Sequence, residues 1–150
     1  MAYIHILAPL DGTVVELESV PDEVFALKMA GDGAAIDPTG QVALAPATGK
    51  LVKLFRGGHA FGIEVEGGVE LIVHLGLDTV ELEGKGFEKI AVEGQLVQAG
   101  DPIVYFERAT IEAAGKSILS PVVSPGNGTI VRRASGVVQA GQDVLFTLEL

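Results

Sequence analysis

The sequence predicts an all-β fold: an antiparallel β-sandwich or barrel with internal pseudo-symmetry and one or two very short helices. Glycine is frequent, with 20 residues among 150, and it separates short runs rich in Val, Ile and Leu. This alternation is typical of short strands joined by tight turns. Helix is expected only at 21–28 and at 108–116, ending near Gly115. No linker stands out, so we expect residues 1–150 to form a single domain.

Two recurring phrases predict the pseudo-symmetry. The first places a small residue and a Pro before a Gly that opens a short apolar strand, and it occurs at 8–15, 45–52 and 124–131. The second is a turn with Ala-Gly that leads into an apolar strand, at 93–101 and again at 138–143. Because the spacing is irregular, the repeats indicate a sandwich or barrel and not a solenoid.

Composition excludes several classes of function. The net charge of −10 opposes binding to nucleic acid or to anionic membranes, whereas it favours a basic protein partner. The absence of cysteine excludes disulfides, thiolate nucleophiles and Cys-based zinc sites. No apolar stretch approaches the ~20 residues of a membrane span, and the N-terminus has no signal-peptide pattern. We therefore expect a cytoplasmic protein that does not insert into the membrane.

The segment 59–74 predicts a β-hairpin. Gly67-Gly68 between two strand-like runs is a strong signal for a two-residue loop. With that loop Glu66 pairs with Val69, and Phe61 lies opposite His74. A four-residue loop preserves this pairing, whereas a loop with an odd number of residues would put the histidines at 59 and 74 on opposite faces.

Two of the three histidines converge in this hairpin. His59 and His74 become diagonal neighbours, roughly 7 Å or less apart at Cβ, on an apolar patch flanked by Phe61 and Ile72. Imidazole can act as a nucleophile, a hydrogen-bond donor or a metal ligand. The third histidine, His5, lies in an apolar strand and is interpreted as structural.

Several stretches match one known family over nearly the whole chain. They are Val-Pro-Asp-Glu-Val-Phe-Ala at 20–26, Gly-Asp-Gly-Ala-Ala-Ile-Asp-Pro-Thr-Gly at 31–40, His-Ala-Phe at 59–61, the long run around His74 at 68–82, Gly-Lys-Gly-Phe at 84–87, and Lys-Ser-Ile-Leu-Ser-Pro-Val-Val at 116–123. Through them the chain resembles the glucose-family IIA component of the bacterial phosphoenolpyruvate-dependent sugar phosphotransferase system.

The resemblance implies a β-sandwich with a shallow apolar depression that holds two histidines. His74 would take a phosphoryl group on Nε2 from the phosphohistidine of the carrier protein HPr and donate it to a cysteine of a IIB domain. His59 would contact that group, and a backbone carbonyl near Gly76 would hold Nδ1–H of His74. The family usually has a threonine two residues before the first histidine; here that position is Gly57, which leaves the hydrogen bonding of His59 open.

The resemblance also implies an apolar partner-binding face with an acidic rim, which suits arginine-bearing partners. Its expected members are Asp22, Val24, Phe25, Phe55, Ile72, Asp78 and Val80. The partners would be phospho-HPr and the IIB domain of a sugar permease, so that the protein associates with the membrane only through protein contacts. No cofactor is expected, and regulatory binding to other proteins is left open.

Two other classes compete with this interpretation. The spacing of His74 and Asp78 is also used by a family of zinc peptidases, but that family needs a downstream His-x-His, which this chain lacks. We expect at most weak zinc binding at His59 and His74, because the set of ligands is incomplete. A biotinyl or lipoyl carrier would suit the Ala-Gly turns, but the modified lysine in its usual context is missing.

Overall fold

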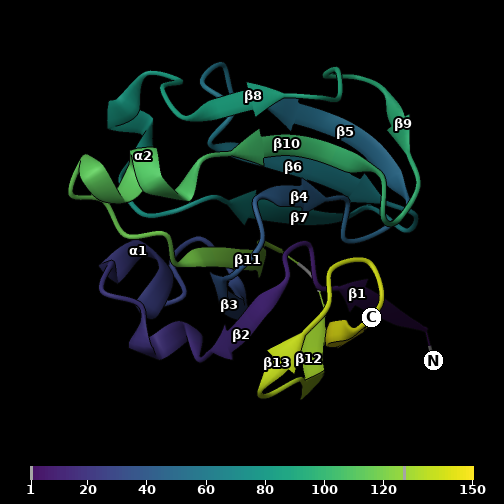
Figure 1. Ribbon diagram of the computed structural model, residues 1–150. Helices are drawn as coiled ribbons and strands as arrows, with labels where there is room; N and C mark the ends of the chain where they lie inside the picture. The colour runs from purple at the N-terminus through teal and green to yellow at the C-terminus, as the bar shows by residue number, and fades with distance from the viewer. Residues whose placement is uncertain (1, 127) are drawn as a thin grey trace.

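A computed structural model describes residues 2–126 and 128–150, and it confirms the expected all-β fold with short helices (Figure 1). Every strand pairing that it records is antiparallel. The strands form one eight-stranded and two three-stranded sheets. Asn127, within the third copy of the first recurring phrase, and Met1 lie outside the described residues.

The eight-stranded sheet carries the central hairpin. Its order is β13 (Val137–Val138), β2 (Gly12–Val15), β3 (Asp32–Pro38), β11 (Ser120–Ser124), β7 (Val69–His74), β6 (Ala60–Val65), β5 (Gly49–Leu54) and β9 (Leu96–Val97).

The smaller sheets complete the sandwich. One has the order β1 (Tyr3–Leu7), β14 (Val144–Glu149) and β12 (Thr129–Arg133), and the other β4 (Val42–Leu44), β10 (Pro102–Phe106) and β8 (Phe87–Lys89). The main core lies between the sheets, and its largest fully buried side chains include Phe61, Phe106 and Phe146.

The first recurring phrase forms a reciprocal backbone contact. The N–H of Leu7 donates to the carbonyl of Pro46 at 2.8 Å, and the N–H of Leu44 donates to the carbonyl of Pro9 at 2.9 Å. Each of the first two copies thus pairs with the residue that precedes the other. This exchange is the local signature of the internal pseudo-symmetry that the sequence predicts.

The second recurring phrase repeats a hydrogen bond as well as a sequence. The carboxylate of Asp101 accepts from the N–H of Gln98 at 2.8 Å, and the carboxylate of Asp143 accepts from the N–H of Gln139 at 2.7 Å. A short acidic side chain that caps a turn in this way fixes the turn and starts the next strand. The strands that follow are β10 and β14.

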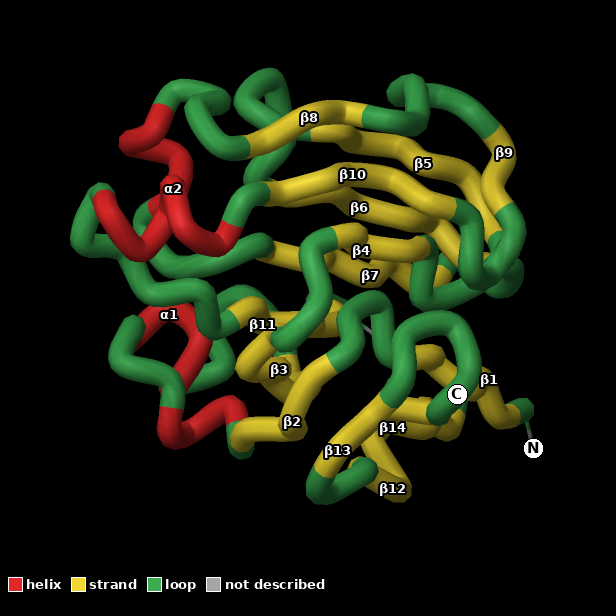
Figure 2. Tube along the Cα trace, in the orientation of Figure 1, coloured by secondary structure: helices red, strands yellow, loops and turns green. Residues whose placement is uncertain are grey.

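All helical segments gather on one side of the molecule (Figure 2). They are α1 (Glu23–Ala26), α2 (Arg108–Ala113) and the 3-10 turns η1 (Leu17–Ser19) and η2 (Thr79–Leu82). The two expected helices are present but shorter than expected. Asp22 caps α1 by accepting the N–H of Val24 at 3.0 Å. None of the helices among the described residues is long and apolar enough to cross a membrane.

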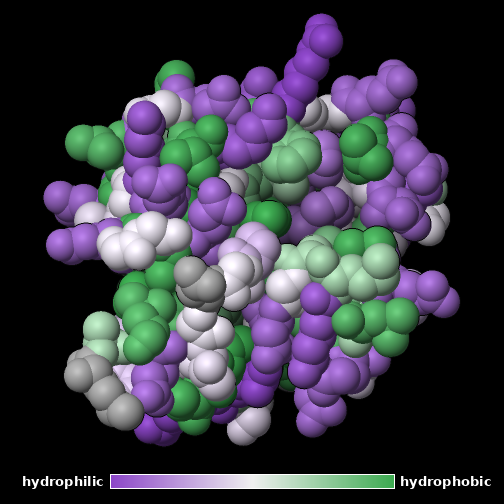
Figure 3. Space-filling model, turned by 180° about the vertical axis from the view of Figure 1, so that it is seen from behind, coloured by the Kyte–Doolittle hydropathy of each residue, from purple (hydrophilic) through white to green (hydrophobic). Residues whose placement is uncertain are grey.

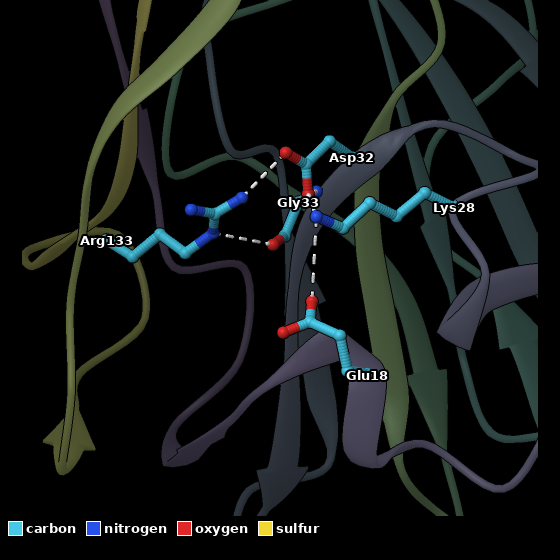
Figure 4. A network of polar contacts seen from close by, with 5 residues as sticks. All are labelled: Glu18, Lys28, Asp32, Gly33 and Arg133. Atoms are coloured by element: carbon cyan, nitrogen blue, oxygen red, sulfur yellow. Dashed lines mark hydrogen bonds and ion pairs between the residues drawn. The ribbon is translucent and has the colours of Figure 1, made fainter.

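An exposed polar network ties the α1 region to β3 and β12 (Figure 4). Arg133 lies 2.7 Å from the Asp32 carboxylate, and Lys28 bridges Asp32 and Glu18 at 3.6 and 3.8 Å. Burial alone would raise the pKa of Asp32. Hydrogen bonds from Arg133 and from the Gly33 N–H, with the charges of Arg133 and Lys28, outweigh it and lower that pKa.

The hairpin register differs by one residue from the expectation. Three residues, 66–68, form the loop, so Val65 pairs with Val69 and His74 lies opposite Ala60, not opposite Phe61. Burial explains the shift, because Val65 and Val69 both face the core, whereas the predicted register would pair the exposed Glu66 with the buried Val69. The glycines at 67 and 68 both adopt positive φ and accommodate this longer loop.

The register also corrects the expected apolar patch. Phe61 points into the main core with Val73, whereas Ile72 and His74 lie on the opposite face of the sheet. The expectation that Phe61 flanks the histidines was therefore wrong. Of Phe61 and Ile72, only Ile72 lies on the same face of the sheet as His74.

Candidate functional site

Two imidazole rings meet at the helical side of the molecule. His59 directly precedes β6 and His74 ends β7, and the start of one strand meets the end of the next in an antiparallel hairpin. Their ring centroids are 5.4 Å apart. In a hairpin with an odd-numbered loop, strict alternation would put the two rings on opposite faces of the sheet. His59, however, lies in a bend that precedes the paired residues of β6, directly after Gly58 at φ +84°. The alternation of faces therefore does not govern its side chain.

A backbone carbonyl fixes the proton of His74. Its Nδ1 lies 2.6 Å from the carbonyl oxygen of Gly76. A carbonyl can only accept a hydrogen bond, so Nδ1 must carry the hydrogen. In the neutral ring Nε2 then keeps its lone pair, which makes Nε2 the nucleophilic atom.

A second, smaller apolar cluster supports His74. The Phe25 ring of α1 packs against the imidazole with centroids 5.3 Å apart, and only 7% of Phe25 is exposed. The cluster comprises Leu17, Val20, Phe25, Ala35, Leu77 and Val123, with Ile72 packed against it. Phe25, one of the residues expected on the partner-binding face, is buried here against the ring of His74.

His59 is held by aromatic rings. Phe55 and Phe87 lie with their centroids 5.3 and 6.5 Å from its ring, and 6% of the residue is exposed. Within residues 2–126 and 128–150, no hydrogen bond is recorded for either ring nitrogen of His59. A Cβ at Gly57 would lie 3.3 Å from Nδ1 of His59, so the bare glycine leaves that nitrogen uncovered.

Beside His59 the surface is hollowed. The hollow has a volume of about 630 Å³, and its lining consists of Phe55, Arg56, Gly57, His59, Val80 and Glu83. It therefore joins the imidazole to the exposed apolar surface of Phe55 and Val80.

Both histidines favour the neutral state. Burial lowers the pKa of His59 below its ordinary value of 6.5, and the neighbouring His74 lowers it further. Burial also lowers the pKa of His74, against the opposing effects of the Gly76 carbonyl and the carboxylates of Asp22 and Asp78. At neutral pH the site therefore presents two uncharged imidazoles.

Exposed apolar residues surround the histidines. Of the expected members, Val24, Phe55 and Val80 are exposed, while Ile72 is partly buried. The charges of Asp22 and Asp78, the two expected rim carboxylates, act to raise the pKa of His74. Figure 3 shows the molecule from behind, with one of its hydrophobic patches on the side of α1.

Two exposed residues escaped sequence reasoning. Leu27 and Met29, just after α1, are 66% and 70% exposed. The sequence pattern that could have revealed them is a pair of apolar residues on either side of Lys28. In the structure the chain turns at Lys28, which has φ 60°. A turn places consecutive apolar side chains outside any core-facing pattern, so exposed apolar surface could have been expected there.

The zinc-site alternative requires a third ligand beside the two histidines. Within the described residues, no group of three or more His, Cys, Asp or Glu side chains could hold a metal ion. Asp78 therefore does not complete a metal-binding set with the two histidines.

The fold and the site define a class of protein, an antiparallel β-sandwich that presents two imidazoles 5.4 Å apart, one of which lines a surface hollow. A family model for the phosphoenolpyruvate-dependent sugar phosphotransferase system, EIIA 1, matches residues 4–131. The chain therefore belongs to the EIIA family of this phosphotransferase system.

Individual relatives agree with this assignment. The chain is 44% identical to the glucose-specific EIIA component of Haemophilus influenzae, over 97% of this chain and 89% of the relative. It is 46% identical to the N-acetylglucosamine-specific EIICBA component of Klebsiella pneumoniae, of which it spans only 23%. The solved glucose permease IIA of Mycoplasma capricolum superposes with a TM-score of 0.95 at 42% identity, covering 99% of this chain and 97% of that one.

Proposed function

We propose that the protein is a phosphocarrier that accepts a phosphoryl group from phospho-HPr on Nε2 of His74 and donates it to a cysteine of a IIB domain. The observation that carries the proposal is the 2.6 Å contact between Nδ1 of His74 and the Gly76 carbonyl. It leaves the Nε2 lone pair free for attack on phosphorus.

The two transfer steps conserve bonds, electrons and protons without a cofactor. Nε2 of neutral His74 forms a bond to phosphorus as the bond from phosphorus to the nitrogen of HPr breaks, and HPr leaves with a neutral imidazole. The IIB thiolate then attacks the same phosphorus, and the electron pair of the P–N bond returns to Nε2. Nδ1 keeps its proton throughout.

His59 supports the transferring group. Its ring lies 5.4 Å from that of His74, close enough to place a donor beside phosphoryl oxygens on Nε2. Preorganised donors at such a position stabilise the charge that the oxygens carry during transfer. We expect His59 to act in the transfer and not as the acceptor.

The exposed apolar side chains around the site form the proposed docking face for both partners. Val24, Phe55 and Val80 supply apolar contact, and Asp22 and Asp78 supply charge at the rim. Relatives named EIICBA components contain a matching segment within a longer chain, which supports a IIB-bearing permease as the acceptor. Membrane association would occur through that partner.

The test is to incubate the protein with phosphoenolpyruvate, enzyme I and HPr and then map acid-labile phosphate. His74→Gln should abolish labelling, while His59→Gln should still be labelled but pass phosphate to IIB ~10²–10³-fold more slowly. His5→Gln is the matched control, since His5 lies on β1, which pairs with β14, and its ring contacts Thr147 and neither His59 nor His74. It should behave as wild type. Persistent labelling of His74→Gln would refute the assignment.

A further inference from the structure

The carbonyl that holds His74 belongs to a segment that is itself hydrogen-bonded on each side. The N–H of Gly76 donates to Oγ of Ser120 at 3.2 Å, and the N–H of Leu77 donates to the carbonyl of Ser117 at 3.0 Å. Oγ1 of Thr79 donates to the carbonyl of Leu75 at 2.6 Å. Both peptide planes that flank Gly76 therefore have a partner outside the hairpin.

These contacts aim the Gly76 carbonyl. That carbonyl and the N–H of Leu77 are the two ends of one peptide group, which is planar. The plane can turn only if Gly76 changes its φ or ψ, and glycine has unusual freedom to do so. Gly76 has φ +80°, so the direction of its carbonyl depends on what holds the N–H groups on either side.

Ser120 is built to hold the first of these groups. The residue is fully buried at the start of β11, and its hydroxyl donates to the carbonyl of Ile118 at 2.9 Å. With its hydrogen committed to Ile118, the oxygen can offer only lone pairs to the N–H of Gly76. The hydroxyl therefore serves as an oriented acceptor.

We propose that Ser120 is a positioning residue for His74, which sets the tautomer of the imidazole through Gly76. This inference rests on the proposed function, since it names a further residue for the same site. The hydrogen bonds of Ser120 run to Gly76 and Ile118 and not to the ring. It anchors the Gly76 N–H, so that the Gly76 carbonyl stays in line with Nδ1 and Nε2 remains unprotonated.

Loss of the hydroxyl has a defined consequence. Without it the buried Gly76 N–H has no acceptor, and the peptide group between Leu75 and Gly76 turns to find one, which changes φ of Gly76. The Gly76 carbonyl then leaves Nδ1, and part of the His74 population moves its proton to Nε2, which cannot attack phosphorus. Outer partners of this kind typically contribute ~10- to 100-fold to the activity of the histidine that they orient.

The chain supplies a matched control on the same strand. Ser124 is also buried on β11, and its hydroxyl donates to the carbonyl of Glu70 on β7 at 3.0 Å. Ser120→Ala and Ser124→Ala thus remove the same group from the same strand, and both lose a bond to backbone near β7. Only the first bond leads to His74.

The experiment measures the tautomer of His74 directly, by nitrogen-15 NMR of the unphosphorylated protein, together with the rate of labelling by phospho-HPr. Ser120→Ala should lower the Nδ1–H fraction of His74 and slow labelling ~10- to 100-fold, while Ser124→Ala changes neither. Ser120→Thr, which keeps the hydroxyl, should restore both values. Ser120→Cys, which keeps the volume with a weaker acceptor, should fall between if the alanine variant fails to fold.

An unchanged tautomer in Ser120→Ala, or in Ser120→Cys if only that variant folds, would overturn the proposal. An equal loss in Ser124→Ala would overturn it too, since the effect would then be general loss of stability. The NMR result does not depend on phosphate transfer. A failure of the proposed function, seen as labelling of His74→Gln, is therefore distinguishable from a failure of this inference.

Discussion

His59 and His74 are the same residue type 5.4 Å apart, yet the protein treats them differently. The proton of His74 is assigned by the carbonyl of Gly76. His59 packs between aromatic rings and, among the described residues, receives no hydrogen bond at either nitrogen. A fixed tautomer suits an acceptor of a phosphoryl group, whereas an unfixed ring can adjust to oxygens that come and go.

The lowered pKa of each histidine predicts a pH dependence. Both rings bind protons less readily in the folded protein than in the unfolded chain, whose histidines are half protonated at pH 6.5. The free energy of unfolding should therefore fall as pH drops below 6.5, until the folded-state pKa values are passed. Denaturant melts from pH 7.5 to 5 would measure this, and His59→Gln with His74→Gln should flatten the slope. A wild-type stability that rises on acidification would contradict the prediction.

Gly57 gives a second prediction at this scale. A Cβ there would lie 3.3 Å from Nδ1 of His59 and 3.1 Å from the N of Gly84. Gly57→Thr would bring a hydroxyl beside Nδ1 and should convert His59 to one tautomer, read by nitrogen-15 NMR. Gly57→Val crowds Gly84 equally without the hydroxyl, so it should leave the tautomers mixed. Identical spectra for the two variants would exclude the hydrogen bond.

At the scale of elements, the site depends on the turn that follows β7. Gly76 adopts φ +80° there, and a Cβ would lie 2.6 Å from Cγ2 of Thr79 and 2.8 Å from the carbonyl oxygen of Ser117. The segment is thus closed on both sides, and glycine is the residue that fits. The hairpin brings the histidines together, and this turn sets which nitrogen of His74 carries the proton.

Gly76→Ala should therefore lower the free energy of unfolding by more than backbone strain alone would. A left-handed non-glycine residue typically costs ~1–3 kcal/mol, and the contacts with Thr79 and Ser117 add to that. Gly136→Ala is the control, because Gly136 has φ +77° with nothing within 4 Å of its Cβ position. Urea denaturation should show the larger loss for Gly76→Ala. Equal losses would mean that the turn tolerates the side chain.

The short helix α1 mixes two roles that substitution can separate. Val24 is 47% exposed, whereas Phe25 is 7% exposed and packs on His74. Val24→Ser should slow phosphate transfer from phospho-HPr with little change in stability. Phe25→Ala should lower the free energy of unfolding by ~3–5 kcal/mol and impair transfer as well. If Phe25→Ala leaves stability unchanged while transfer falls, Phe25 is a contact residue after all.

At the scale of the whole molecule, a net charge of −10 makes encounter with a cationic partner faster at low salt. Asp22→Asn and Asp78→Asn should each slow labelling by phospho-HPr modestly, by a factor equivalent to ~0.2–1 kcal/mol, and the difference should vanish at high salt. Asn at position 22 can still cap α1. Glu66→Gln, at the far end of the hairpin, removes the same charge and should have a smaller effect. Equal slowing in Glu66→Gln would assign the effect to total charge.

Much of this architecture could be predicted from local sequence, because the strands, turns and recurring phrases are local patterns. The convergence of His59 and His74 was also expected, but through a register that is wrong by one residue. Turn signals fix a loop only to within a residue, whereas the burial of Val65 and Val69 decides it. The hydrogen bond of Ser120 joins segments that are distant in sequence, and that of Thr79 closes a turn with unusual φ angles. Neither contact produces a periodic pattern that could be recognised in the sequence.

Ala2 and the last residue lie side by side, since the N–H of Leu150 donates to the carbonyl of Ala2 at 3.0 Å. The strand β1 and the C-terminus lie on the side away from the helices (Figure 1). A tether fused at either end would thus start from the same point. The imidazoles, at the helical side, would lie away from the tether in both cases. With a long flexible tether, the effective concentration of the imidazoles at a neighbouring domain is then set by tether length and hardly by which end is joined.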